Sequence, residues 1–487
     1  MPGSPAPRDP ALRRHLVAIV LIALAVRAGI GVLANGHGEM EGLADHYEQS
    51  AYALAAGYGY VRPALDVTPV ADLRPLAAEL ARRGQRLTPT NAPPMIAAQW
   101  RPASMHPPGY ALLLLLFYRT LGPPASVWAR ALQVLLDAGA CALVVSIGRR
   151  FGGLRTGLLA GYVSALFLPL AYQVTSRVPD GIAPPLVVLL SWLFLVGLER
   201  RTVLMWSLAG VVSATLVLMR PDWALLPVCL LGGAALLGVG RRRLVTGGLA
   251  WLLVAAVLVL PWALHNRRAI HEFNPGSTAT GMMLLQGVGM FPNPYGVRSE
   301  DGWYDEEARR AGMESSEDPR ASRMFTRRFL EIVRRDPALF LRQSLERLAL
   351  GLVPPYHWGM VNSAYEAHSY YVYRRTESGG PFAIALRHPL ELLGAYWDRL
   401  LFVPVSLLLL LASIACLVHP RANRRRALVL LSPFLYVLVV HLPMFLTVRF
   451  LVPGVFVQWI ALGVLLEGRS SQASGAAPLA VLQAPRG

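Results

Sequence analysis

Carboxylate and imidazole side chains that could carry out chemistry lie close to the ends of long apolar segments. Asp45 follows the first of these segments, and the apolar spacing over residues 47–55 predicts a short helix that Gly57 ends. In one interpretation Asp45 is the N-cap of this helix, and Glu48 completes a capping box. In the other, Asp45 is a general base. Hydrogen bonds to the backbone would weaken such a base, so the two interpretations compete.

Candidate phosphate ligands accompany this carboxylate. His106 precedes Pro107 and Pro108, which suit the first turn of a helix and would hold the imidazole just ahead of it. Four arginines also lie within a few residues of apolar segments: Arg220, Arg267, Arg268 and Arg449. A guanidinium group matches two phosphate oxygens at once. The alternative for each arginine is that it only extends to a polar boundary.

The elements that position these residues must be membrane helices. Of the 487 residues, 54% are hydrophobic and 15% are charged, whereas a soluble globular protein carries about 25% charged residues. The net charge is +17, and all 46 basic residues are arginine. They stand between apolar runs, which indicates membrane topology rather than a nucleic-acid-binding surface. Cys141, Cys229 and Cys416 lie inside apolar runs without CxxC spacing, so neither disulfides nor a thiolate metal site is predicted.

About ten transmembrane helices, within a range of nine to thirteen, are predicted from runs that approach the length needed to cross about 30 Å of hydrocarbon. The runs are Leu16–Ala34, Trp128–Ile147, Leu154–Ala171, Ile182–Leu198, Val203–Met219, Trp223–Val239, Leu244–Leu264, Leu400–Val418, Ala427–Leu446 and Phe450–Leu466. The first resembles a signal sequence, but its length and the runs that follow favour an uncleaved anchor. Gly109–Leu121 is too short to span and is interpreted as a juxtamembrane or re-entrant helix.

The placement of arginine predicts the orientation in the membrane. The connections on one side hold twelve arginines: Arg149, Arg150, Arg155, Arg200, Arg201, Arg241, Arg242, Arg243, Arg421, Arg424, Arg425 and Arg426. Those on the other side hold three: Arg177, Arg220 and Arg449. The richer side is expected to be cytoplasmic. Two large segments, 35–126 and 265–399, would then face outward.

An all-α polytopic membrane protein with two large extracytoplasmic loops follows from this pattern. It comprises a cytoplasmic N-terminus (1–15), a transmembrane core (16–264) that includes the first outer loop, a second outer region (265–399), C-terminal transmembrane helices (400–466) and a disordered cytoplasmic tail (467–487). In the second outer region, residues 336–350 predict an amphipathic helix. Tyr356 and His357 follow it, in an aromatic cluster that belongs to an interfacial belt or covers a sugar substrate.

Two charges lie deeper in the predicted helices. Arg27 is in the first run, and Asp137 is near the middle of the second. A charge at the centre of a membrane costs about 2.5–3.5 kcal/mol, so each needs a partner. We expect Arg27 and Asp137 to pair between neighbouring helices.

Several short motifs occur in a defined order along the chain. They are Asp45-x-Tyr47 with Gly57-x-Gly59, His106-Pro-Pro-Gly-Tyr-Ala-Leu-Leu, Ala-Arg130-Ala-Leu, Gly148-Arg-Arg-Phe-Gly, Met219-Arg-Pro, Pro261-Trp-Ala-Leu-His-Asn-Arg267 and Arg449-Phe-Leu-Val-Pro. This order, from about residue 16 to residue 466, resembles the GT-C glycosyltransferases. It is most similar to the group that contains protein O-mannosyltransferases and the aminoarabinose transferase of lipid A. The resemblance implies a GT-C-type fold with juxtamembrane helices.

The resemblance also implies a function and a site. Such enzymes transfer a sugar from a polyprenyl-phosphate carrier to a lipid, glycan or protein acceptor on the outer face of the membrane, here the bacterial plasma membrane. Asp45 corresponds to the catalytic carboxylate, and the donor phosphate would be held by His106, Arg220, His265, Arg267, Arg268 and Arg449. Further site candidates are Tyr47, Asp180, Tyr356 and His357. No metal ligands and no resident cofactor are implied, while participation of a divalent metal, the sugar and the acceptor stay open.

The chemistry of such a donor fits this small set of residues. A phosphate leaving group, whose second pKa is near ~6, departs without protonation, so the paired carboxyl groups of glycosidases are unnecessary. One base suffices to activate the acceptor hydroxyl, and direct displacement inverts the anomeric carbon. This sequence departs from the family pattern at His46, His265 and Phe450, and the segment Leu73–Leu87, which reads as an amphipathic helix, is an insertion.

Other functions remain open at this stage. A transporter or lipid flippase would place polar residues along a pathway at the membrane midplane, often between broken helices. An O-antigen ligase or polymerase would share the donor class but not the early aspartate. A non-catalytic scaffold would explain the departures at His46 and His265.

Overall fold

The computed structural model describes residues 10–33, 41–56, 59–63, 100–122, 124–200, 202–356, 381–418 and 424–467, with the single residues 82, 368, 373 and 377. The regular secondary structure of this part of the chain is helical apart from two three-residue strands, β1 (Val61–Pro63) and β2 (Trp100–Pro102). The strands pair antiparallel, with Arg62 opposite Arg101. The predicted all-α fold is confirmed, with this small ribbon added to it.

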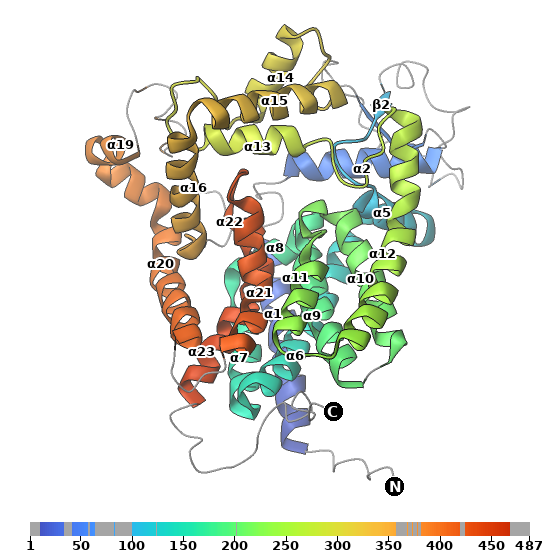
Figure 1. Ribbon diagram of the computed structural model, residues 1–487, viewed down its shortest axis with the longest axis vertical. Coiled ribbons are helices and arrows are strands. Elements are labelled where there is room, and N and C mark those ends of the chain that lie inside the picture. The colour runs from blue at the N-terminus through green and yellow to red at the C-terminus, as the bar shows by residue number, and fades with distance from the viewer. Residues whose placement is uncertain are drawn as a thin grey trace.

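The helices form two layers, seen one above the other in Figure 1. The lower and larger layer contains α1 (Pro10–Leu33), α6 (Ala125–Gly152), α7 (Leu154–Leu166), α8 (Leu168–Thr175), α9 (Ala183–Arg200), α10 (Val203–Met219), α11 (Leu226–Leu236), α12 (Arg241–Ala269), α20 (Pro389–Val418), α21 (Arg424–His441) and α23 (Phe456–Glu467). The upper layer contains α13 (Thr280–Gly289), α14 (Asp301–Arg310), α15 (Pro319–Arg335) and α16 (Pro337–Leu352). Between or beside the layers lie α2 (Glu41–Ala56), α5 (Gly109–Leu121), α19 (Pro381–Arg387), α22 (Val448–Leu451) and the short 3-10 turns η1 (Pro179–Gly181), η2 (Pro221–Trp223) and η3 (Val452–Gly454).

The apolar helices identify a multi-pass membrane protein. Within the described ranges, five helical segments are long and apolar enough to cross a membrane: Pro10–Leu33, Ala125–Gly152, Pro179–Arg200, Arg241–Ala269 and Pro389–Val418. Two bent pairs bring the number to seven if each pair counts as one span. Each of the ten predicted runs falls on helical structure, but the count of ten spans is not confirmed, because α11 has 11 residues and α21 begins with three arginines.

The bend between α7 and α8 has a local cause. The two helices meet at 56° around Phe167, and Pro169 stands in the first turn of α8. Proline has no N–H group to continue the hydrogen bonds of α7. The carbonyls of Ser164 and Ala165 instead accept hydrogen bonds from Arg27 of α1, at 2.8 Å in the case of Ser164.

Arg27 also forms the predicted ion pair. Its Nε lies 2.8 Å from Oδ2 of Asp137 on α6, and both side chains are almost completely buried. The arginine therefore satisfies a carboxylate and two carbonyls at once, which connects α1, α6 and the α7–α8 bend. This contact confirms the pairing hypothesis.

The upper layer has a core of its own. Leu285, Tyr304, Phe325, Phe329 and Leu339 are buried together and separate from the main core of the membrane helices. The predicted amphipathic helix is confirmed as α16, and its N-cap Asp336 accepts a hydrogen bond from the N–H of Leu339 at 2.9 Å. α13–α16 are thus packed as a compact unit over the membrane helices.

The prediction that Asp45 is a helix N-cap is wrong, and several other predictions concern residues that the structure does not describe. α2 begins at Glu41, so Asp45 lies in its second turn and is not the N-cap. The helix ends at Ala56, directly before Gly57, as predicted. The proposed helix over 73–87, apart from Arg82, the residue His357 and the tail beyond Glu467 lie outside the described residues.

Candidate functional site

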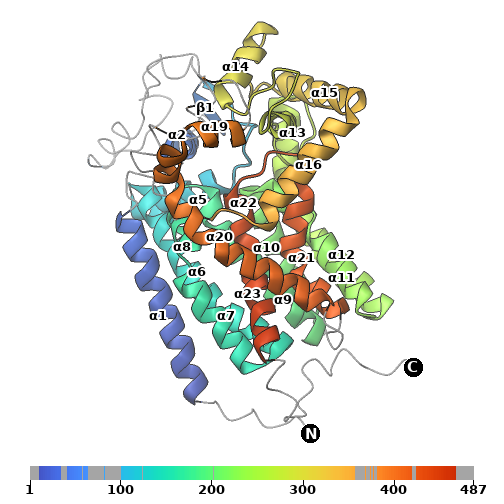
Figure 2. The ribbon, with the colours of Figure 1, turned by 90° about the vertical axis from the view of Figure 1, so that its left-hand side faces the viewer.

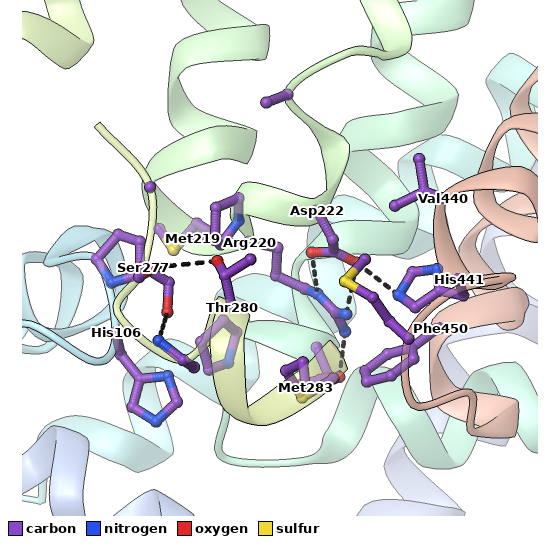
Figure 3. A pocket seen from close by; sticks show the side chains of 18 of the residues that line it. His106, Met219, Arg220, Asp222, Ser277, Thr280, Met283, Val440, His441 and Phe450 are labelled. Carbon is purple, nitrogen blue, oxygen red and sulfur yellow. Dashed lines mark hydrogen bonds and ion pairs between the residues drawn. The ribbon is translucent and has the colours of Figure 1, made fainter. Parts of the chain in front are cut away.

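A cavity of about 440 Å³ lies where the two layers meet. Its lining comes from segments far apart in the sequence, and Figure 3 shows His106 and Ser277 on one side with His441 and Phe450 on the other. The lining residues are Tyr47, His106, Pro107, Pro179, Asp180, Met219, Arg220, Pro221, Asp222, Ala224, Leu225, Asn274, Gly276, Ser277, Ala279, Thr280, Met283, Tyr436, Val440, His441, Met444, Arg449 and Phe450. Five of the predicted site residues are among them: Tyr47, His106, Asp180, Arg220 and Arg449.

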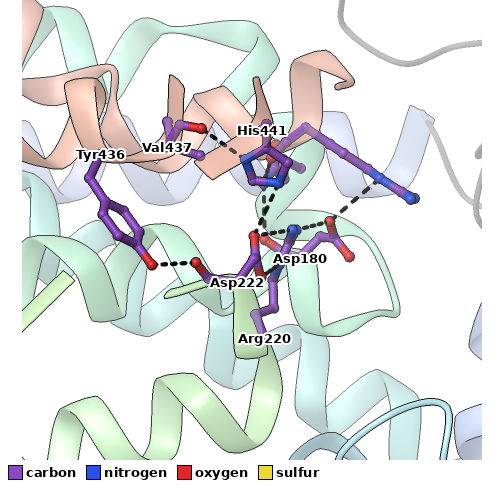
Figure 4. A network of polar contacts seen from close by, with 8 residues as sticks. Asp180, Arg220, Asp222, Tyr436, Val437 and His441 are labelled. Atoms are coloured by element: carbon purple, nitrogen blue, oxygen red, sulfur yellow. Dashed lines mark hydrogen bonds and ion pairs between the residues drawn. The ribbon is translucent and has the colours of Figure 1, made fainter. Parts of the chain in front are cut away.

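Arg220 is the centre of the polar part of this cavity (Figure 4). It is the C-cap of α10, and Pro221 directly after it prevents the helix from continuing. Its Nε and Nη2 donate to the two carboxylate oxygens of Asp222 at 3.0 and 2.7 Å, and its Nη1 contacts Asp180. Because the side chain is only 8% exposed, this double pairing is what keeps its charge compatible with burial.

Arg449 approaches the same carboxylate from α22. Its Nε lies 3.8 Å from Oδ1 of Asp180, and its side chain is 36% exposed. The guanidinium carbons of Arg220 and Arg449 lie 4.6 and 5.0 Å from the centre of the Phe450 ring, within the range of cation–π attraction. Gln173 fixes the backbone here, because its amide donates to the carbonyls of Arg449 and Asp180.

His441, the last residue of α21, completes the network on the other side of Phe450. Its ring stacks on Phe450 with a centroid distance of 4.6 Å. Nδ1 lies 2.8 Å from the carbonyl oxygen of Val437, which can only accept a hydrogen bond, so Nδ1 carries a hydrogen. Nε2 then faces Oδ2 of Asp222 at 3.7 Å. The tautomer of His441 is therefore fixed by its own helix.

Two loops form the opposite wall. The chain before α5 is joined to the chain before α13, because the N–H of Thr278 donates to the carbonyl of Ser104 at 3.2 Å and Ser277 bonds the carbonyl of Met105. The hydroxyl of Tyr60 donates to the carbonyl of His106 at 3.0 Å. These contacts hold His106 at the cavity although its side chain lies on a loop.

Tyr47 brings α2 to the cavity. Its ring is buried and lies 5.4 Å from the ring of His106. Burial, together with the nearby Tyr60 and Asp180, raises the pKa of the Tyr47 phenol well above its ordinary value. The hydroxyl therefore stays protonated and can donate a hydrogen bond into the cavity.

The other predicted site residues are not brought to this cavity. His265 is half-buried near the end of α12 and stacks on Trp262 at 5.5 Å, while Arg267 and Arg268 are exposed on the same helix. Tyr356 is fully buried against Phe167. The side chain of Asp45 and the whole of His357 lie outside the described residues, so α2 positions the backbone of Asp45 only.

Sequence reasoning missed two residues of the network. Asp222 follows Arg220 by two positions, and His441 is an ionisable side chain inside the predicted span 427–446. Ionisable residues within apolar segments are often functional. The position of His441 inside a predicted span could therefore have identified it as a site candidate. Among the described residues, no three His, Cys, Asp or Glu side chains are grouped so that they could hold a metal ion.

The fold and this cavity define a multi-pass helical membrane protein with a polar cavity at the ends of its apolar helices. Residues 105–265 match the sequence model of the family described as dolichyl-phosphate-mannose-protein mannosyltransferase. The match confirms the resemblance to the GT-C superfamily. It includes His106, Asp180 and Arg220, whereas Asp45 and Arg449 lie outside it.

Comparisons with whole proteins gave more distant similarities. None of the curated proteins matches. Two solved structures of the oligosaccharyltransferase from Archaeoglobus fulgidus are similar: the AglB complex with an inhibitory peptide and a dolichol-phosphate, at 11% identity, and an apo form, at 12%. Each match has a TM-score of 0.47 and covers 93% of this chain and 50% of the other. This chain therefore spans about half the length of the structures that it matches.

Proposed function

We propose that this protein is a GT-C-type glycosyltransferase that moves a sugar from a polyprenyl-phosphate donor to an acceptor hydroxyl at the outer face of the bacterial plasma membrane. The observation that carries the proposal is the cavity itself. It gathers Tyr47, His106, Asp180, Arg220 and Arg449, residues singled out in five separate parts of the sequence.

The lining of the cavity suits an amphiphilic donor. Met219, Leu225, Met283, Val440 and Phe450 form an apolar wall. Beside it Arg449 presents a partly exposed guanidinium group, while the charge of Arg220 is balanced by Asp180 and Asp222. A polyprenyl phosphate combines an apolar chain with an anionic head, so it needs both kinds of surface. A water-soluble sugar nucleotide would gain little from the apolar wall.

The two arginines are suited to different tasks. Arg220 is held by two carboxylates and buried, so its main role is to position Asp180 and Asp222. Arg449 is more exposed and contacts Asp180 at a longer distance. Because it is more exposed, it is the cation that a phosphate entering the cavity can reach more directly. A bidentate contact there would stabilise the leaving group as negative charge develops.

Asp45 is the proposed general base. It lies two residues before Tyr47 on α2, a helix that reaches the cavity wall. In the proposed reaction the Asp45 carboxylate takes the proton of the acceptor hydroxyl, and the oxygen attacks the anomeric carbon. The bond from that carbon to the phosphate oxygen breaks, the polyprenyl phosphate leaves as an anion, and the configuration inverts.

The proposal is tested with cells that carry the wild-type gene, no gene, or Asp45→Asn. Mass spectrometry of envelope glycolipids, glycans and glycoproteins should find one product that disappears in the last two strains, with a polyprenyl-linked sugar that accumulates. Glu346→Gln is the control, because it neutralises an exposed carboxylate on α16 that does not line the cavity. Wild-type product levels in Asp45→Asn, at equal amounts of membrane-inserted protein, would falsify the assignment of the base.

A transporter or flippase for lipid-linked sugars is the second candidate. The observation in its favour is that α7–α8 and α22–α23 are bent by 56° and 50°, as broken helices in transporters are. The same strains separate the two candidates. Loss of a transporter leaves the donor on the cytoplasmic face, whereas loss of the transferase leaves it accessible from outside to a soluble glycosidase.

A further inference from the structure

A second cavity of about 370 Å³ lies on the outer side of the loop that borders the first. One wall is the exposed face of α15, and the other is the chain between α12 and α13. The lining residues are Glu272, Asn274, Thr278, Pro319, Ser322, Arg323, Thr326, Arg327, Leu330, Glu331 and Arg334. Figure 2 shows α15 in the upper layer, on the opposite side of the molecule from the lower end of α1.

Three arginines provide the positive charge in the lining of this cavity. Arg323, Arg327 and Arg334 are spaced at i, i+4 and i+11 on α15, which places them on one helical face. Arg323 forms an ion pair with Glu272 across the cavity. Arg327 and Arg334 are exposed and form no ion pair with any residue that the structure describes, Glu331 included. Two guanidinium groups are therefore available to an anion.

Neutral hydrogen-bonding groups lie beside these arginines. Ser322, Thr326, Thr278 and Asn274 line the same cavity. Thr326 already donates its hydroxyl hydrogen to the carbonyl of Ser322, and the hydroxyl of Thr278 is shared with Ser104. The hydroxyl of Ser322 and the amide of Asn274 accept backbone N–H groups, so their own hydrogens can be donated to an anion. A carboxylate offers two oxygens, whereas a phosphate monoester offers three and twice the charge near neutral pH. The combination of two available guanidinium groups with two neutral donors fits the phosphate better.

The loop 272–280 is a wall common to both cavities. Asn274 lines both, while Ser277 and Ala279 line the first and Thr278 lines the second. The loop is firmly held, because Trp262 donates to the carbonyl of Gly276 at 3.0 Å, and Asn266 donates to the carbonyl of Asn274 at 2.7 Å. A ligand anchored in the second cavity would thus sit one loop away from the proposed reaction site.

We propose that the second cavity binds a phosphate group carried by the acceptor substrate. The assignment of the ligand as an acceptor substrate rests on the proposed function. The existence of a phosphate-binding site in the second cavity does not depend on it. The phosphate belongs either to a lipid headgroup or to a soluble phosphorylated glycan. In both cases Arg327 and Arg334 contact it directly, and they bind rather than catalyse.

The test measures binding to the full-length protein in detergent by isothermal titration calorimetry. Two probes are used separately, inorganic phosphate and short-chain phosphatidic acid. Wild type is compared with Arg327→Gln/Arg334→Gln and with the control Arg335→Gln/Arg342→Gln. The control removes the same charge from exposed positions of α15 and α16 that do not line the cavity. Arg449→Gln serves to identify any phosphate bound in the first cavity.

We expect a binding component whose affinity falls at least tenfold in Arg327→Gln/Arg334→Gln but is unchanged in the control and in Arg449→Gln. Binding of inorganic phosphate identifies a phosphate that needs no lipid, and binding of phosphatidic acid alone identifies a lipid headgroup. An equal loss of affinity in Arg335→Gln/Arg342→Gln would show that any basic surface binds the probes, and it would overturn the proposal. Unchanged affinity in Arg327→Gln/Arg334→Gln would overturn it too, as would the absence of binding of both probes to wild type. Asp45→Asn should bind like wild type. The two proposals therefore fail separately, because transfer without this binding contradicts only the second and binding without transfer contradicts only the first.

Discussion

Arg220 and Arg449 carry the same charge in the same cavity but have different surroundings. Arg220 is buried between Asp180 and Asp222, whereas Arg449 is partly exposed and lies farther from Asp180, at 3.8 Å. Replacing Arg220 by Gln leaves two buried carboxylates without their cation, which costs about 3–5 kcal/mol. Arg449→Gln is expected to cost less than about 1 kcal/mol of stability but to remove a charged contact to the donor.

Thermal unfolding in detergent and binding of a polyprenyl phosphate separate these effects. Arg220→Gln should lower the unfolding temperature markedly. Arg449→Gln should unfold close to wild type and bind the lipid phosphate about tenfold to a hundredfold more weakly, as expected for losing a charge-assisted hydrogen bond of about 1.5–3 kcal/mol. Unaltered lipid binding in Arg449→Gln would contradict its assigned role.

The sequence predicted which residues belong to the site better than it predicted which side chains contact them. Arg27 and Asp137 could be paired in advance because a charge in an apolar helix needs a counter-charge. The network around Arg220 could not, because Asp180 contacts it from 40 positions away and His441 reaches Asp222 from another helix. Trp262 and His265 are three residues apart on α12, a spacing that brings side chains together. The family position of His265 was nevertheless taken as evidence for the site, although the residue lies outside the cavity.

Among the helices, α1 is connected to α6 and to the end of α7 by Arg27. Either single reversal, Arg27→Asp or Asp137→Arg, places two like charges together in the membrane core and should cost at least about 3–5 kcal/mol. The double reversal restores the pair but leaves the carbonyls of Ser164 and Ala165 without the donors of Arg27. We therefore expect partial rescue of the folded yield, measured by size-exclusion chromatography. A double variant no better than the worse single variant would argue against the pairing.

Close packing of α6 on α7 gives a second prediction at this scale. A Cβ added to Gly148 would lie 2.8 Å from the Cα of Gly157, a backbone atom that cannot yield easily, whereas a Cβ added to Gly139 on the same helix meets nothing within 4 Å. Gly148→Ala should destabilise by about 1–3 kcal/mol, and Gly139→Ala should be neutral or slightly stabilising. Thermal unfolding of the two variants side by side checks this, and equal stability would mean that the helices are less closely packed.

Elements were predicted well where a periodic or apolar pattern was continuous, as for α5, α10 and α16. The bends were not predicted. The run 154–171 is apolar throughout, and the break appears only because Pro169 removes one hydrogen bond and Arg27 compensates for it. The start of α2 was misplaced because a plausible capping pair existed inside the helix.

For the whole molecule, the placement of arginine predicts one orientation. α12 has 29 residues and a rise of about 1.5 Å per residue, so it is longer than the hydrocarbon core. Its first residues would lie in the cytoplasm and α14 outside. In a variant without native cysteines, a membrane-impermeant thiol reagent should label Arg310→Cys in intact spheroplasts but Arg242→Cys only after lysis. The reverse pattern would invert the topology and remove the proposed outer site.

At the scale of the whole molecule, the sequence predicted the elements but not how they pack together. Composition and arginine placement indicate a polytopic protein with outer segments. They contain no information about which helix ends meet, and the cavity exists because η1, η2, α21 and α22 converge there with two loops. That convergence depends on long-range packing, which no local pattern encodes.

The pairing of Arg27 with Asp137 also has a consequence for biosynthesis. The two residues are 110 positions apart, and ribosomes add about 5–20 residues per second, so α1 is made roughly 5 to 22 seconds before its counter-charge exists. During that interval the first helix holds an arginine among apolar residues with no carboxylate from α6 to receive it. The packing of α1 against its neighbours therefore waits for α6, and a nascent chain halted between them should be extracted at alkaline pH more readily than the finished protein.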